Sequence, residues 1–273
     1  MITSETVFSV RAKAATNVAR QATNAHRVAG FIVFGATVIH AAPATPRYSQ
    51  DIDLCHDAAA AVAETAAADA AALAKEGYTV TWQLQQPTFH RATVHRNDGS
   101  VKLEWVYDSA WRFYPVEPDA ELGYRLHFFD AATNKMLALS GRAEPRDFVD
   151  AIHLHQAYLN LGTLAWAAAG KDGGLNPHLI LDLAERFARY RQEEIDALHL
   201  ARPLSLPALK AAWSEALAEG RALVDRLPAL EAGCAYLDPV SRAPVVPDPE
   251  SPAFASLERH FGSVGGTWPV IGH

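Results

Sequence analysis

Arg47-Tyr48-Ser49-Gln50-Asp51-Ile52-Asp53-Leu54 is the run of residues from which the fold is most readily inferred. Its alternation of polar and apolar residues predicts a β-strand over residues 49–55. Because side chains alternate along a strand, Asp51 and Asp53 point to one face while Ile52 and Leu54 point into the core. Two like charges held so close together are unfavourable without a cation, so the pair predicts a Mg²⁺ site, with Mn²⁺ as the alternative metal. The competing interpretation is an ordinary solvated strand face.

A strand-to-helix turn lies upstream of this pair. Phe31–Phe34 is apolar and predicts a buried strand, which Gly35 and a short helical stretch to Ala42 follow. Backbone N–H groups at such a turn can face a phosphate. Gly35, Ala36 and Thr37 are therefore candidate nucleotide-binding residues. A glycine at the end of a strand is also common as a simple turn, and that interpretation stays open.

Glu104 is the candidate for a third carboxylate, which many sites of this kind need to complete the metals or to activate an attacking hydroxyl. It lies in the middle of a predicted strand, Val101–Tyr107, which follows two others at Tyr78–Gln85 and Phe89–Arg96. The alternative is a strand residue that pairs with Lys102 on the same face.

A second charged segment extends from Asp130 to Asp150. Lys135 stands in the middle of an apolar helix and could act as a point charge on phosphate. Asp147 and Asp150 lie three residues apart and therefore share one helical face. Structural salt bridges that link two helices are the alternative, and the residues alone favour that alternative.

The remaining pattern divides the chain into a mixed part and a helical part. We expect an α/β (α+β) fold, with a small mixed sheet flanked by helices over residues 1–142 and an α-helical C-terminal domain over residues 143–273. The other predicted elements are helices at 4–28, 57–75, 130–140, 145–159, 162–169, 177–198, 206–226 and 253–261, and a strand at 124–129.

Composition restricts the partners and the compartment. The net charge of -7 means that the surface as a whole repels nucleic acid, so an RNA must meet a local basic patch. Lys13, Arg20 and Arg27 on the helix over 4–28 could form one, although such stripes are usually a solvated face. Cys55 and Cys234 are isolated from each other in the sequence, which predicts reduced thiols. We expect a cytoplasmic protein with no membrane segment.

Three segments, in this order, carry a resemblance. They are Gly35 before a helix, the run Arg47-x-Ser49-x-Asp51-Ile52-Asp53-Leu54, and Asn134-Lys135-x-x-Ala138-Leu139-x-x-Arg142-x-x-x-Arg146-Asp147-x-x-Asp150. Together they are similar to the AbiEii/AbiGii toxin family of nucleotidyltransferases, in the DNA polymerase β-like superfamily. The match spans roughly residues 30–155. One departure is Phe34-Gly35, where the family usually has paired glycines.

The resemblance implies a nucleotidyltransferase fold and a Mg²⁺-dependent transfer of a nucleoside monophosphate from a nucleoside triphosphate (NTP) to an acceptor hydroxyl. Several members of the family act on the tRNA 3′ end. It also implies a toxin with a cognate antitoxin. Two alternatives stay open. One is an enzyme of the same fold that nucleotidylates a small molecule or a protein; the other is a non-catalytic nucleotide-binding protein, which Phe34 and the acidic surface suggest.

The resemblance also implies roles for single residues. Asp51 and Asp53 would hold Mg²⁺, with Glu104 as a loosely implied third ligand. Arg47 and Ser49 would lie beside the nucleotide. Lys135 would grip phosphate, and Asp150, with Asp147 beside it, would complete the acidic site.

Overall fold

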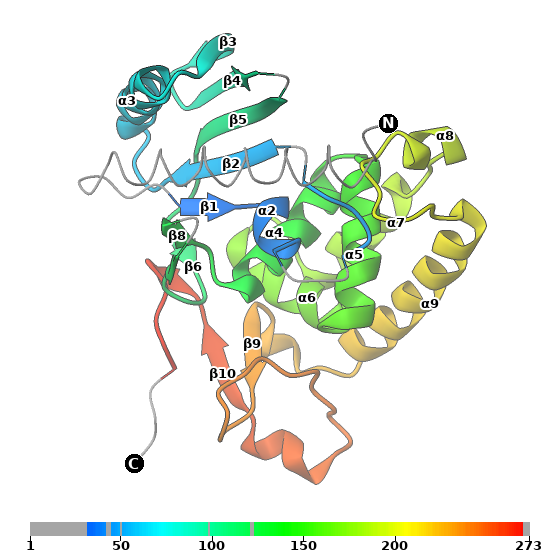
Figure 1. The fold of residues 1–273 in the computed structure, drawn as a ribbon. Coiled ribbons are helices and arrows are strands. Elements are labelled where there is room, and N and C mark those ends of the chain that lie inside the picture. The colour runs from blue at the N-terminus through cyan, green and yellow to red at the C-terminus, as the bar shows by residue number, and fades with distance from the viewer. Residues whose placement is uncertain (1–31, 42–44, 50, 98, 121–122, 270–273) are drawn as a thin grey trace. The chain divides into compact units, whose positions relative to one another are not determined.

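The computed structural model describes residues 32–41, 45–49, 51–97, 99–120 and 123–269 (Figure 1). Contacts divide these residues into two compact units. The first takes the described residues within Met1–Ala41, Ser49–Ala110 and Val116–His127, and the second takes those within Ala42–Tyr48, Trp111–Pro115 and Phe128–His273. The predicted helix over 4–28, with its basic face, lies outside the described residues.

A seven-stranded mixed sheet forms the frame of the first unit, with the strand order β3-β4-β5-β2-β1-β8-β7. The strands are β1 (Ile32–Phe34), β2 (Asp51–His56), β3 (Thr79–Gln86), β4 (Phe89–Arg96), β5 (Gly99–Tyr107), β7 (Glu117–Asp119) and β8 (Gly123–Arg125). Strand β2 runs parallel to β5 and antiparallel to β1. The expected α/β class with a mixed sheet flanked by helices is confirmed.

Helix α3 (Ala61–Lys75) covers one face of this sheet, against β3, β4, β5 and β2. Leu73 of the helix and Leu103 and Trp105 of β5 are fully buried. Nε1 of Trp105 donates a hydrogen bond to Asp69 of α3, which fixes the side of β5 that faces the helix. Because side chains alternate along a strand, the even-numbered residues of β5 face the other side of the sheet. A short helix, α2 (Ala36–Ile39), follows β1.

Helices dominate the second unit. They are α4 (Phe128–Gly141), α5 (Pro145–Ala157), α6 (Leu161–Ala168), α7 (Pro177–Phe187), α8 (Gln192–Asp196) and α9 (Leu206–Val224), with short 3₁₀ turns η1 (Ala169–Lys171), η2 (Ala229–Glu231) and η3 (Pro252–Ser256). Helices α6 and α9 cross closely at two glycines: a Cβ on Gly162 would collide with the carbonyl oxygen of Gly220. No helix among the described residues is long and apolar enough to cross a membrane.

Two short strand pairs complete the second unit. Strand β9 (Cys234–Leu237) pairs antiparallel with β10 (Glu258–Phe261), and β6 (Trp111–Arg112) pairs antiparallel with β11 (Ser263–Val264). The sequence predicted a helix over 253–261, and that prediction is wrong over its second half because these residues form β10. The predicted helix over 177–198 is also interrupted, since α7 ends at Phe187 and α8 begins at Gln192.

The predicted strand over 124–129 is too long, because β8 ends at Arg125 and α4 begins at Phe128. Asp130, where the predicted helix begins, therefore lies inside the first turn of α4. Its buried carboxylate accepts hydrogen bonds from the backbone N–H groups of Phe113 and Tyr114. Contacts place α4 in the second unit, whereas the sequence divided the chain after residue 142. The division into a nucleotidyltransferase domain over 1–142 and a helical domain over 143–273 stays a prediction.

Candidate active site

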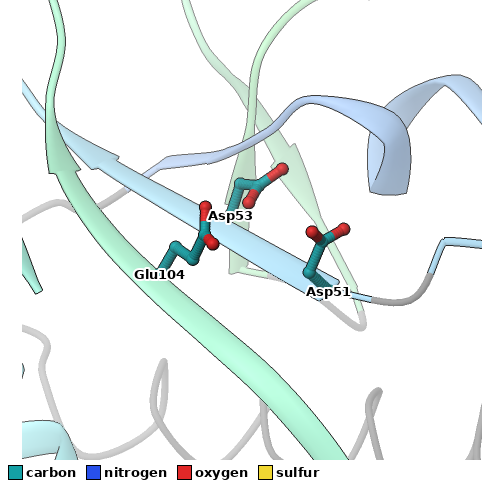
Figure 2. Close-up of side chains that lie close together, drawn as sticks. All are labelled: Asp51, Asp53 and Glu104. Atoms are coloured by element: carbon teal, nitrogen blue, oxygen red, sulfur yellow. The ribbon is translucent and has the colours of Figure 1, made fainter. Parts of the chain in front are cut away.

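Three carboxylates converge on the face of the sheet opposite α3. Strands β2 and β5 are parallel and in register, so that Asp51 lies opposite Lys102 and Asp53 opposite Glu104. One carboxylate oxygen from each of Asp51, Asp53 and Glu104 lies within 4.8 Å of the other two. Figure 2 shows these three side chains together, two from β2 and one from β5. We call them the acidic triad, and its all-oxygen donor set is the kind that Mg²⁺ binds.

Two basic side chains, Lys102 and Arg91, form ion pairs with this triad. Nζ of Lys102 lies 2.9 Å from Oδ2 of Asp51 and 3.1 Å from Oε1 of Glu104. Nε of Arg91, on β4, lies 2.7 Å from Oε1 of Glu104. Burial alone would lower the pKa of Lys102, but the two carboxylates raise it above its ordinary value. The site thus attracts positive charge, which fits a metal-binding role.

Gly35 allows the Asp53 carboxylate to lie where it does. The backbone of Gly35 has φ of 68°, in the left-handed region that favours glycine. A Cβ at this position would lie 2.5 Å from Oδ2 of Asp53. The glycine that the sequence placed at a phosphate-binding turn is therefore also in direct steric contact with the acidic triad.

Phe34, the departure from the family pattern, lies opposite Asp53 across the β1–β2 pair. Its side chain is partly buried and packs against a small apolar cluster that includes Ile32, Cys55 and Leu126. The phenylalanine therefore has a packing role in the first unit, which explains an apolar residue beside the turn.

Two hydroxyl groups hold the start of β2. Oγ1 of Thr37 donates to the backbone oxygen of Asp51 at 3.1 Å, and Oγ of Ser49 donates to the same oxygen at 2.8 Å. Ser49 also lies 3.3 Å from Oδ1 of Asp51. The first unit therefore brings together Asp51, Asp53 and Glu104 with the predicted nucleotide-binding residues Gly35, Ala36, Thr37 and Ser49.

The other predicted site residues form an ion cluster within the second unit. Nζ of Lys135 lies 2.6 Å from Oδ1 of Asp147 and 3.0 Å from Oδ2 of Asp150. Arg47 donates through Nε and Nη2 to both oxygens of Asp150, at 2.6 and 2.5 Å. Nε of Arg142 lies 2.8 Å from Oδ2 of Asp147. We call these five residues the second-unit ion cluster.

Burial and ion pairing shift the pKa values of residues in this cluster. Asp147 and Asp150 are completely buried, and Lys135 is 5% exposed. Burial alone would lower the pKa of Lys135, but the carboxylates of Asp150 and Asp147 raise it. Conversely, burial alone would raise the pKa of Asp147, but Lys135 and Arg142 lower it. The contacts of Lys135 with Asp147 and Asp150 link α4 to α5, as the salt-bridge alternative predicted.

Arg47 also fixes the segment that leads into β2. Arg47 forms a β-bridge with Leu200, and the N–H of Tyr48 donates to the carbonyl oxygen of His199 at 2.8 Å. The guanidinium of Arg47, which the sequence predicts beside the nucleotide, pairs with the carboxylate of Asp150 in this structure.

The sequence missed the position of Lys102 between two of the triad carboxylates. The sequence does suggest the ion pair between Lys102 and Glu104, which is present in the structure. The contact of Lys102 with Asp51 arises only because β2 and β5 are parallel neighbours. Alternation along β5 was the available signal, because it places Lys102 and Glu104 on one face.

Comparison with known proteins gives a family match and a shared fold. The model of the family described as "Nucleotidyl transferase AbiEii toxin, Type IV TA system" matches residues 21–233. No curated protein matches the chain. Among solved structures, JHP933 from Helicobacter pylori is similar at a TM-score of 0.53 and 16% identity, over 83% of this chain and 96% of that one.

Two further solved structures share the fold. MenT4, a nucleotidyltransferase toxin from Mycobacterium tuberculosis, has a TM-score of 0.54 at 14% identity, over 78% of this chain and 83% of its own. A candidate nucleotidyltransferase from Helicobacter pylori has a TM-score of 0.52 at 17% identity, over 80% of this chain and 97% of its own. At these identities the likeness shows the fold, and the family model shows the membership. The chain belongs to the AbiEii family of nucleotidyltransferase toxins of type IV toxin–antitoxin systems.

Proposed function

We propose that this nucleotidyltransferase moves a nucleoside monophosphate from an NTP to an acceptor hydroxyl and that it requires Mg²⁺. The observation that carries the proposal is the convergence of Asp51, Asp53 and Glu104 within 4.8 Å. In this proposal the three carboxylates hold the metal. Mg²⁺, when bound, supplies charge neutralisation and a fixed position for the phosphates.

The neighbouring residues would keep the triad in place and receive the nucleotide. Thr37 and Ser49 hold the backbone of Asp51 through their hydroxyl groups, and the hydrogen of Gly35 leaves room for Asp53. We propose that the backbone at Gly35, Ala36 and Thr37 faces the triphosphate. Support comes from the steric contact between this turn and the triad.

Lys135, Asp147, Asp150 and Arg47 stay in the proposal as predicted site residues. Their contacts support a positioning role most directly, because each charge is paired inside the second-unit ion cluster. A buried, hydrogen-bonded cluster of this kind fixes the geometry of the elements that carry it. In this chain those elements are α4, α5 and the segment that leads into β2.

We propose the 3′ hydroxyl of tRNA as the acceptor, as the family resemblance implies. Family membership also brings an NTP substrate and a cognate antitoxin as partners. With a net charge of -7, the protein is expected to contact RNA over a small area and to recognise shape and a single-stranded end rather than a long duplex.

The acceptor can be identified by label transfer. The protein is incubated with Mg²⁺ and each α-labelled NTP, in separate reactions with total tRNA, a protein extract or a metabolite pool. The proposal predicts label in tRNA and none in tRNA whose 3′ ends have been oxidised with periodate. Label only in protein or in small molecules would replace tRNA by the first alternative. No label, together with no Mg²⁺-dependent nucleotide binding by calorimetry, would refute the catalytic proposal.

A further inference from the structure

Lys102 lies where a metal ligated by the acidic triad would have to compete with it. Its ammonium contacts the carboxylates of both Asp51 and Glu104, from the opposing register position on β5. These are two of the three carboxylates whose oxygens converge. A divalent cation held by the same carboxylates would therefore compete with Lys102, because the double positive charge of the ion repels an ammonium at such short range.

We propose that Lys102 is a built-in counter-ion of the metal-free enzyme, and that its ammonium changes partner to the triphosphate when a divalent cation binds. The inference rests on the proposed metal-dependent function and adds a nucleotide-binding residue to it. The incoming nucleotide brings negative charge to the site together with the metal, so the displaced ammonium finds a new anion within its reach.

The side chain of Lys102 suits this exchange. It is 32% exposed, in contrast to the buried Lys135, so it has room to turn away from the carboxylates. A lysine also carries a compact charge on a flexible four-carbon stem, which can bind a phosphate as a point charge. Arg91 lies on the neighbouring strand and pairs with Glu104, which leaves a second cation beside the triad.

A merely structural ion pair predicts something different. Partly exposed ion pairs contribute little to stability, and removing one partner would change neither metal nor nucleotide affinity in a defined direction. The proposed exchange predicts opposite changes in the two affinities. Removing the ammonium should strengthen metal binding, because a competitor is lost, and weaken nucleotide binding, because a phosphate ligand is lost.

The test uses calorimetric titration of the full chain with Mn²⁺ in the absence of nucleotide. Lys102→Met is compared with the wild type and with Lys102→Arg, which keeps the charge. Lys75→Met is the matched control, because Lys75 is exposed at the end of α3, which covers the other face of the sheet. We expect Lys102→Met to bind Mn²⁺ about tenfold more tightly, with Lys102→Arg and Lys75→Met close to the wild type.

The second titration adds a non-hydrolysable NTP at saturating Mn²⁺. We expect Lys102→Met to bind it about tenfold more weakly than the wild type, with partial rescue in Lys102→Arg. Thermal melting with and without Mn²⁺ checks for a folding defect. Without the metal, Lys102→Met should melt at a lower temperature than the wild type, and Mn²⁺ should raise its melting temperature by a larger amount.

Equal or weaker Mn²⁺ binding by Lys102→Met overturns the inference and leaves the proposed function intact. Tighter Mn²⁺ binding with unchanged nucleotide affinity overturns the change of partner. If neither the wild type nor Lys102→Met binds Mn²⁺, the metal site of the proposed function fails and the inference fails with it.

Discussion

A side-chain carbon on Gly35 would lie 2.5 Å from Oδ2 of Asp53, closer than two non-bonded atoms can approach. The residues come from the turn after β1 and from the middle of β2, so the conformation of the turn and the position of the carboxylate depend on each other. The backbone of Gly35 also has a positive φ of 68°. Two independent constraints therefore require glycine here.

Gly35→Ala should lower both stability and activity. The left-handed backbone conformation should cost about 1–3 kcal/mol in the free energy of unfolding, measured by urea titration. The added methyl group should also push Asp53 away from the triad and lower kcat/KM. Gly77→Ala is the matched control, because Gly77 has φ of 81° and a Cβ added there would meet no atom within 4 Å. Full activity in folded Gly35→Ala would show that the turn does not position Asp53.

Charge balance in the second-unit ion cluster predicts an asymmetry between two substitutions. In Asp150→Asn, Arg47 and Lys135 lose a shared buried carboxylate, which should cost about 3–5 kcal/mol. In Lys135→Met, Asp147 keeps Arg142 and Asp150 keeps Arg47, so the loss should be smaller. Urea unfolding of both variants at neutral pH checks the order. A larger loss in Lys135→Met would mean that the lysine, and not Asp150, organises the cluster.

Asp69 predicts a pH dependence of stability. Burial raises the pKa of its carboxyl group from 3.8 to about 7, against the opposing hydrogen bond from Trp105. The folded state therefore binds this proton more tightly than the unfolded state does. Its contribution lowers the free energy of unfolding as the pH rises from about 4 to about 7.

Asp69→Asn should remove that loss while keeping an acceptor for Trp105. We expect the variant to be more stable than the wild type at pH 8, by at most about 4 kcal/mol, and to differ little from it at pH 4. Urea unfolding of both proteins at the two pH values measures the difference. A gain of the same size at both pH values would show that ionisation of Asp69 is not the cause.

Local pattern was enough to predict the elements that carry the triad. Strand β4 was predicted residue for residue as Phe89–Arg96. Period-two alternation placed Asp51 and Asp53 on one face, and Glu104 lies at the centre of the predicted strand Val101–Tyr107. These predictions succeeded because each depends on residues that are close together in the sequence.

The errors have a common physical cause in distant contacts. The local sequence predicts a helix that begins at Asp130, but the helix begins at Phe128 and the carboxylate of Asp130 binds backbone N–H groups of Phe113 and Tyr114, which come from another segment. Strand β10 exists because β9 pairs with it, and a short sequence window contains no such information. The Arg47–Asp150 ion pair likewise joins residues 103 positions apart.

If the acidic triad performs metal-dependent nucleotidyl transfer, turnover must depend on both the metal and Asp53. Pyrophosphate release from NTPs is measured in the presence of total tRNA, as Mg²⁺ is titrated into the wild type and into Asp53→Asn. We expect release by the wild type to rise with Mg²⁺ and to stop when the metal is chelated. Asp53→Asn should be slower by at least about a hundredfold while remaining folded. Release at the same rate by folded Asp53→Asn would contradict a catalytic role for the triad.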